Sequence, residues 1–323
     1  MLACGYMHSQ NREGLELSII VPLFNEFESI PHFLARMREV APELGIFELI
    51  MVDDGSRDGS RDVIARSQGT LPVQVIILTR NFGQTAALAA GIERARGDVI
   101  VTIDADLEND PHDIPKLVAL LNEGYDVVSG WRQGRWSGQR LTRKFPSLIA
   151  NWLISRLTGV YLHDYGCTLK AYRADVIKSV RLYGEMHRFI PAYASWQGGK
   201  VAELKVKHEP RRHGKSNYGF GRVFRVLLDL VVVVFMHRYM NRPMHFFGAW
   251  GFLSAALGVI AGFVAVLLRL LGVADLVETP LPILATLFTL VGVQLILFGV
   301  IAEILMRTYY ESQNKRPYNI KKS

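Results

Sequence analysis

The sequence contains few cysteines and none of the common glycine motifs for phosphate binding. Its 323 residues include only two cysteines, Cys4 and Cys167, which excludes a disulfide framework and a cysteine-ligated metal site. We expect both as reduced thiols. The turn at residues 55–60 lacks the G-x-G-x-x-G and G-K-[ST] patterns, so dinucleotide and P-loop sites are not indicated. Since the first residues lack a basic start followed by an apolar core, we also expect no signal peptide.

Charge is missing from two long stretches near the C-terminus. Residues 246–268 and 281–302 form runs of 23 and 22 residues without a charged side chain. A core helix of a soluble protein seldom stays uncharged for so long, so we expect two transmembrane helices. Arg238 and Arg242 precede the first run, and Arg307 and a basic tail follow the second. The positive-inside rule therefore predicts a multi-pass protein of the inner cell membrane with both ends in the cytoplasm.

Acidic and basic residues are unevenly distributed along the chain. Residues 1–130 contain 10 Lys/Arg and 20 Asp/Glu, a net charge of −10, whereas residues 131–225 contain 19 and 5, a net charge of +14. A basic block directly before two membrane spans is expected to face anionic lipid. No RNA- or DNA-binding motif is readable, so we expect the lipid bilayer as a partner and no nucleic acid.

Short apolar runs alternate with helix-like segments over the first 130 residues. The expected strands are 17–23, 47–52, 73–78, 98–103 and 126–129, and the expected helices lie around 27–43, 60–67, 84–96 and 112–123. This repeat predicts a mostly parallel sheet with helices between its strands. The loops after the strands would meet at one sheet edge, where open α/β sheets bind their ligands.

The segment after the fourth expected strand, DADLEND at residues 104–110, is strongly acidic. On an extended backbone Asp104, Asp106 and Glu108 share one parity, so three carboxylates can converge on Mg²⁺ or Mn²⁺ and leave positions open for phosphates. The alternative is a solvated acidic turn in which Asp110 caps the next helix. The strand before the segment favours the metal site.

Carboxylates also follow the first two expected strands, at Glu26 and at Asp53 and Asp54. In this place they can accept hydrogen bonds from ribose hydroxyls or a base N–H, while a cation neutralises a diphosphate. Ser56 and Asp58 are equally well explained as helix caps.

Six motifs occur in the order SIIVPLFNE, VDDGSRDGS, NFGQTAALAAGIERARGD, DADLEND, DVVSGWR and DYGCTLKAYR. Together they resemble GT-A glycosyltransferases of family 2, in the polyprenyl-phosphate branch that includes dolichol-phosphate mannose synthase and the bacterial GtrB-like enzymes. The resemblance covers nearly the whole chain. It implies an α/β fold with a GT-A (Rossmann-like, mostly parallel sheet) catalytic domain, followed by interfacial helices and two transmembrane helices.

The resemblance also implies the reaction and its participants. A hexose would move from a nucleotide-diphosphate sugar to polyprenyl phosphate with the help of Mg²⁺ or Mn²⁺. Glucose as the sugar, UDP as its carrier, inversion at the anomeric carbon and a homo-oligomer follow from the resemblance alone.

The resemblance also implies roles for individual residues. At Glu108 this chain departs from related sequences, which often have Gln at that position. The implied nucleotide-sugar residues are Pro22, Glu26, Asp53, Asp54, Asp104, Arg212 and Ser216. The implied metal ligands are Asp104, Asp106 and Glu108, and the implied catalytic residues are Asp104, Asp106 and Asp164. The implied acceptor-phosphate residues are Arg132, Arg135, Arg143 and Lys144. His213 and Lys215 would assist Arg212 and Ser216 with the leaving diphosphate.

A lipid phosphate is already anionic near neutral pH, so it can attack the anomeric carbon without a general base. The enzyme then has to gather anions, which suits the basic block, and among its residues Arg132 comes first because it ends an expected strand. Asp164 would orient a substrate or accept a proton, and the alternative is an ordinary pair with a nearby arginine.

The expected organisation has five segments. They are an N-terminal extension 1–16, a cytoplasmic GT-A domain 17–219, an interfacial amphipathic helix 220–243, a transmembrane hairpin 244–306 and a basic cytoplasmic tail 307–323. Residues 143–158 suit either an interfacial helix or core packing.

Other functions fit parts of the same sequence pattern. A transferase with a hydroxyl acceptor is an open alternative. Polysaccharide synthases carry Q-x-x-R-W, whereas this chain has only QGRW at residues 133–136. An inactive membrane scaffold or lipid-sugar binder would predict the loss of Asp104 or Asp106, and both are present.

Overall fold

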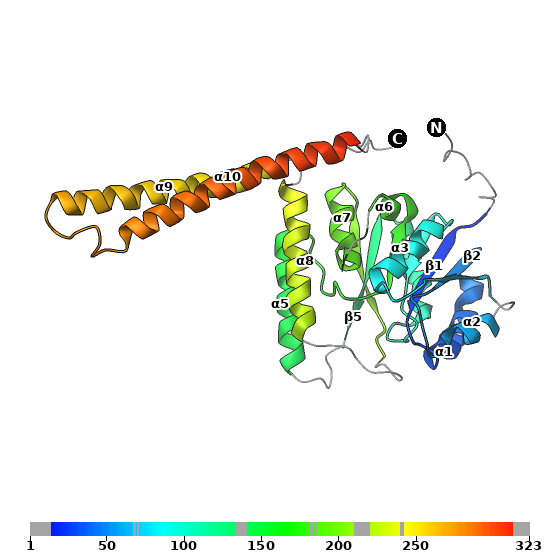
Figure 1. Ribbon diagram of the computed structural model, residues 1–323. Coiled ribbons are helices and arrows are strands. Elements are labelled where there is room, and N and C mark those ends of the chain that lie inside the picture. Colours follow the sequence, from blue (N-terminus) through cyan, green and yellow to red (C-terminus); the bar gives the residue numbers. More distant parts are fainter. Residues whose placement is uncertain are drawn as a thin grey trace. The chain divides into compact units, whose positions relative to one another are not determined.

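The computed structural model describes residues 14–66, 69, 71–133, 141–180, 182, 184, 186–209, 220–239 and 242–312, without the side chains at 141–147, 220–227 and 310. The chain divides into two compact units, Met1–Val233 and Val234–Ser323. Figure 1 shows a sheet with flanking helices in the first unit and a helical hairpin in the second.

A seven-stranded sheet forms the centre of the first unit, in the order β3-β2-β1-β4-β6-β5-β7. Its strands are β1 (Leu17–Leu23), β2 (Phe47–Asp53), β3 (Val73–Ile77), β4 (Val99–Thr102), β5 (Val127–Arg132), β6 (Lys170–Arg173) and β7 (Val201–Val206). β6 runs antiparallel between β4 and β5, and the other neighbours are parallel. The predicted α/β class with a mostly parallel sheet is confirmed.

Helices lie between and after the strands of this sheet. They are α1 (Ser29–Val40), α2 (Ser60–Arg66), α3 (Gln84–Arg94), α4 (Ile114–Asn122), α5 (Leu141–Thr158), α6 (Ala174–Ser179), α7 (Ile190–Trp196) and α8 (Phe220–Tyr239), with 3₁₀ turns η1 (Ala41–Glu43), η2 (Pro111–Asp113) and η3 (Met186–Phe189). Alternation along β1 separates two cores, because Ile19 packs in the core with α1 and α4 while Ile20 packs in the core with α3, α6 and α7.

Four of the five expected strands lie within one residue of their predicted bounds at both ends. The fifth, predicted to end at residue 129, continues to Arg132 as β5. β6 and β7 were not predicted. The short β6 begins with the buried Lys170, so its sequence KAYR lacks the apolar pattern that announces a central strand.

The second unit is a hairpin of α9 (Pro243–Leu270) and α10 (Leu281–Ser312). Small residues allow the helices to approach closely, since a side chain at Gly251 would come within 2.7 Å of Ile296 and 2.9 Å of the Gly292 carbonyl oxygen. Windows of 18 residues within Pro243–Leu270 and Leu281–Tyr309 have mean hydropathies of 2.4 and 2.3, so both helices are long and apolar enough to cross a membrane.

The exposed face of α5 is apolar at its centre. Leu148, Ile149 and Trp152 are exposed, whereas Ile154 and Thr158 are buried against the rest of the unit. The helix therefore packs one face in the core and exposes apolar side chains on another among the described residues, and its interfacial placement stays a prediction.

Candidate active site

The acidic segment lies directly after β4, at the carboxyl edge of the sheet. Its backbone turns at Ala105 and Asp106, and Leu107 adopts a left-handed conformation with a φ of 59°. The extended backbone assumed in the parity argument is therefore absent from this segment. Asp106 Oδ1 instead accepts a hydrogen bond from the backbone N–H of Glu108 at 3.0 Å, which closes a short turn.

Asp104 is held by a residue at the start of α3. The side-chain amide of Gln84 donates to Asp104 Oδ1 at 2.8 Å. Burial and the neighbouring charge of Asp106 raise the pKa of Asp104 to about 7. The two carboxylates repel each other when both are ionised. A cation bound between them would offset that repulsion.

The residues present fit a divalent metal of the Mg²⁺ type. Such an ion is commonly held by one or two carboxylates and completes its coordination with water and substrate phosphates. Asp104 and Asp106 provide hard oxygen donors at the sheet edge. Among the residues that the structure describes, no group of three or more His, Cys, Asp or Glu side chains is arranged to hold a metal alone. The further ligands would come from water and substrate.

Glu108, the third predicted ligand, contacts an arginine. Arg132 Nη1 lies 3.1 Å from Glu108 Oε2, and the same guanidinium donates to both carboxylate oxygens of Asp164, at 2.7 and 3.2 Å. Arg132 thus joins the end of β5 to the acidic segment and to the loop before β6. The predicted metal role of Glu108 and acceptor role of Arg132 stay predictions, and both groups already have partners within the protein.

The loop that presents Asp164 is held by Glu203 on β7. Glu203 Oε1 accepts the backbone N–H groups of His163 and Asp164 at 2.9 and 3.1 Å, and Oε2 lies 2.6 Å from His163 Nδ1. The His163 ring stacks on Trp131 with the ring centroids 4.0 Å apart. These contacts place Asp164 beside Arg132.

The carboxylates after β2 are committed to the loops around them. Asp53, fully buried, accepts hydrogen bonds from the Ser56 N–H at 2.9 Å and from Arg61 Nε at 2.5 Å. Asp54 accepts the backbone N–H groups of Phe82 and Gly83 at 2.7 and 2.8 Å. Their predicted nucleotide contacts stay predictions, and the geometry shows that they shape this edge of the sheet.

The loop after β1 docks on the loop after β2. Asn25, with a φ of 55°, donates its N–H to Ser56 Oγ at 2.9 Å, and the Glu26 N–H donates to Ser60 Oγ at 3.0 Å. Ser56 and Ser60 therefore bind a neighbouring loop, and Ser56 is not a simple helix cap. Pro22 lies inside β1, paired with Val52.

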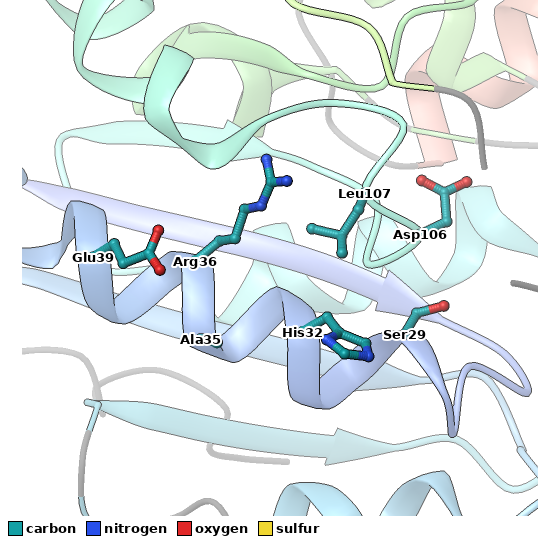
Figure 2. A pocket seen from close by; sticks show the side chains of 7 residues that line it. All are labelled: Ser29, His32, Ala35, Arg36, Glu39, Asp106 and Leu107. Carbon is teal, nitrogen blue, oxygen red and sulfur yellow. The ribbon is translucent and has the colours of Figure 1, made fainter. Parts of the chain in front are cut away.

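A hollow of about 250 Å³ opens beside the acidic segment (Figure 2). It is lined by Ser29, His32, Ala35, Arg36, Glu39, Asp106 and Leu107. One wall is the surface of α1 and the other is the turn that carries Asp106. The acidic segment therefore stands clear of α1 on this side.

The structure brings together the predicted residues at the ends of β1, β2, β4 and β5. Arg135, Arg212, His213, Lys215 and Ser216 lie outside the described residues. For Arg143 and Lys144 only the helical backbone of α5 is described.

Sequence reasoning missed several polar residues next to the site. Besides Gln84 and Glu203, these include Thr85, whose Oγ1 lies 2.7 Å from the buried His187 Nδ1, and the buried Lys170. Lys170 Nζ donates to the Tyr165 carbonyl at 3.1 Å, and burial lowers its pKa to about 8. The signal available for Lys170 was its place inside the motif DYGCTLKAYR, directly after Leu169 and before Ala171.

The family model for glycosyl transferase family 2 matches residues 18–181. The chain is 44% identical over 321 residues to dodecaprenyl-phosphate galacturonate synthase of Rhizobium johnstonii, an alignment that covers 96% of this chain and 93% of that protein. It is 37% identical over 317 residues to undecaprenyl-phosphate 4-deoxy-4-formamido-L-arabinose transferase of Shewanella sediminis, covering 97% and 93%.

Solved structures share the fold at low sequence identity. Glucosyl-3-phosphoglycerate synthase from Mycobacterium tuberculosis, in complex with Mn²⁺, uridine diphosphate and phosphoglyceric acid, matches with a TM-score of 0.55 and 18% identity. The match covers 69% of this chain and 78% of that one. The predicted GT-A type of catalytic fold is thereby confirmed.

Proposed function

The chain belongs to glycosyl transferase family 2, and on that premise we propose that it transfers a sugar from a nucleotide-diphosphate donor to polyprenyl phosphate. The observation that carries the proposal is the pair Asp104 and Asp106 at the carboxyl edge of the sheet, in a chain that also has two helices able to cross a membrane. Both relatives named above, similar over nearly the whole chain, bear names of polyprenyl-phosphate sugar transfer.

In the proposed reaction, an oxygen of the lipid phosphate attacks the anomeric carbon while the bond from that carbon to the donor diphosphate breaks. The nucleotide diphosphate takes the electron pair, and the product is a sugar linked to the polyprenyl chain through one phosphate. Because the attacking oxygen is already anionic, the protein has no proton to remove. Attack opposite the leaving group would invert the anomeric centre.

Asp104 and Asp106 are the residues that would hold Mg²⁺ or Mn²⁺. When bound, the ion supplies positive charge to the diphosphate as it leaves. Gln84 keeps Asp104 oriented through its 2.8 Å hydrogen bond. Asp164, fixed by Arg132 and Glu203, is suited to positioning a substrate more than to accepting a proton, since both its oxygens already accept hydrogen bonds.

The sugar and nucleotide of the donor are less narrowly indicated than the lipid phosphate acceptor. UDP-glucose is the donor predicted from the sequence resemblance, whereas the two relatives are named for galacturonate and for formamido-arabinose. The relatives thus support lipid-phosphate transfer while differing in the sugar. The assay should therefore compare UDP-glucose with UDP-galacturonate and with other nucleotide sugars.

The test is incubation of the full-length protein in detergent with labelled nucleotide sugars and polyprenyl phosphate. We expect butanol-extractable label that disappears with EDTA and falls by about a hundredfold or more in Asp104→Asn and Asp106→Asn. Asp62→Asn is the matched control, because Asp62 is exposed on α2 and its replacement should leave transfer unchanged. Label that appears only on a hydroxyl acceptor, or on no acceptor across the donor panel, would reject the proposal.

A further inference from the structure

Arg36, on α1, binds two carboxylates that come from distant parts of the chain. Its Nη1 lies 3.0 Å from Asp110 Oδ2, and its Nη2 lies 3.2 and 3.3 Å from the two carboxylate oxygens of Glu209. The Arg36 side chain is 24% exposed, and those of Asp110 and Glu209 are 8% and 17% exposed. In Figure 2 the Arg36 side chain rises from α1, and Leu107 lies between its guanidinium and Asp106.

Both partners of Arg36 fix the downstream end of the acidic segment. Glu209 donates its backbone N–H to the Glu108 carbonyl at 3.1 Å, and His208 Nδ1 lies 3.1 Å from the same oxygen. Asp110 caps η2 by accepting the His112 N–H at 3.2 Å.

The backbone of Glu108 connects these anchors to the candidate metal ligand. Its N–H donates to Asp106 Oδ1 at 3.0 Å, while its carbonyl accepts from Glu209. A movement of Glu209 would therefore be passed through the backbone on either side of the Glu108 Cα to the Asp106 carboxylate. Arg36 reaches Asp106 by this route without direct contact, and its ion pair with Asp110 holds the same segment farther along the chain.

Without Arg36, the Asp110 and Glu209 carboxylates would share one small region with less compensating charge. Lys207 also contacts both, at 3.4 and 2.9 Å, but its side chain is 62% exposed. An exposed lysine is a point charge in solvent, whereas the guanidinium holds Glu209 in a bidentate geometry. The structure gives Arg36 a task that Lys207 cannot take over.

We propose that Arg36 is a positioning residue for the metal and diphosphate site, acting through Glu209 and Asp110 on the turn that carries Asp106. The inference rests on the proposed metal-dependent transfer for its functional meaning. It assigns a role to a residue outside the sheet edge and outside all the motif positions predicted to contact substrate.

The first measurement is hydrogen–deuterium exchange of the full-length protein in detergent. In Arg36→Met we expect peptides covering residues 104–110 to exchange about tenfold faster than in the wild type, because a charged hydrogen-bond network is lost. Glu209→Gln, a milder change, should give a smaller increase in the same peptides. Arg36→Lys should restore part of the protection, since it keeps the charge but loses the bidentate contact.

The second measurement is binding of Mn²⁺ in the presence of uridine diphosphate, followed by electron paramagnetic resonance. We expect the half-saturating Mn²⁺ concentration to rise about tenfold in Arg36→Met. The matched control is Arg96→Met, which breaks a comparable contact of Arg96 Nε and Nη2 with Glu48 Oε2 at 3.1 and 2.9 Å, at the opposite end of β1 and β2. Arg96→Met should lower thermal stability without changing Mn²⁺ binding.

The outcomes distinguish the positioning role of Arg36 from the proposed metal-dependent transfer. Unchanged exchange at residues 104–110 in both Arg36→Met and Glu209→Gln would overturn the positioning role, whatever the metal does. Equal weakening of Mn²⁺ binding in Arg36→Met and Arg96→Met would also overturn it, because the effect would then be one of general stability. A wild-type protein that binds no Mn²⁺ would overturn the proposed metal-dependent transfer instead, while the exchange data would still decide the structural link.

Discussion

Asp164 accepts two hydrogen bonds from Arg132, from Nε at 2.7 Å and from Nη2 at 3.2 Å, and the side chains are only 8% and 3% exposed. The bidentate geometry compensates both charges within the protein. Because Arg132 also contacts Glu108, the pair ties the loop before β6 to the acidic segment. Substitution of either residue is therefore expected to change the stability of the folded protein.

Asp164→Asn should destabilise the protein, since it leaves a buried guanidinium without one of its countercharges. We expect a loss of about 3 kcal/mol in the free energy of unfolding, measured by thermal or chemical denaturation of the detergent-solubilised protein. The double variant Arg132→Met/Asp164→Leu should lose less stability than the summed losses of Arg132→Met alone and Asp164→Leu alone. If Asp164→Asn were as stable as the wild type and only raised the KM for polyprenyl phosphate, the pair would serve the acceptor and not the fold.

Gln84→Leu should impair transfer with little loss of stability. The variant removes the amide that donates to Asp104 Oδ1 and leaves a side chain of similar volume. We expect kcat to fall by about tenfold or more, because a hydrogen bond to a charged group typically contributes about 1.5–3 kcal/mol. Steady-state kinetics at several Mn²⁺ concentrations is the measurement. Gln74→Leu, on the edge strand β3, is the control, and equal losses in both variants would show that the hydrogen bond to Asp104 is unimportant.

Asp54→Asn should weaken the fold at the edge of the sheet as well as any donor contact. The two Asp54 oxygens accept the N–H groups of Phe82 and Gly83, and an asparagine would turn an N–H₂ group toward one of them. We expect a cost of about 1–3 kcal/mol in unfolding free energy, compared with less than about 1 kcal/mol for Asp62→Asn, which is exposed in the first turn of α2. A raised donor KM at unchanged stability would instead indicate that Asp54 acts on the nucleotide alone.

Lys170 should make stability depend on pH in the alkaline range. Burial lowers its pKa from 10.5 to about 8, so between these values the unfolded chain binds more protons at this residue than the folded one. Stability relative to Lys170→Met should therefore rise as pH increases from 8 toward 10.5, by about 1–3 kcal/mol. Melting temperatures of the two proteins across this range give the answer, and a constant difference between them would contradict the prediction.

The elements before residue 130 could be predicted closely because their signals are local. β1 and β4 are continuous apolar runs, which is how a strand buried on both faces reads in sequence. β6 could not be found in the same way. Its position between β4 and β5 depends on antiparallel pairing with two strands that precede it in the chain, and its first residue is a lysine.

The candidate site likewise has residues that could be predicted from the sequence and others that could not. Asp104 and Asp106 were identifiable because acidic residues directly after a buried strand lie at the edge where open α/β sheets bind ligands. The parity of Glu108 failed as an argument because Leu107 leaves the extended conformation, and residue order cannot report a left-handed turn at a leucine.

By itself the sequence determined the alternation of strands and helices, the acidic segment at a strand end and the two long apolar helices. Each of these depends on neighbouring residues, through side-chain periodicity or the uninterrupted length of an apolar run. Only the tertiary structure decided which partner each charged group has. Arg132 pairs with Asp164 at the sheet edge, and Arg36 on α1 pairs with Asp110 and Glu209, because folding brings distant segments together, where buried charges must find compensation.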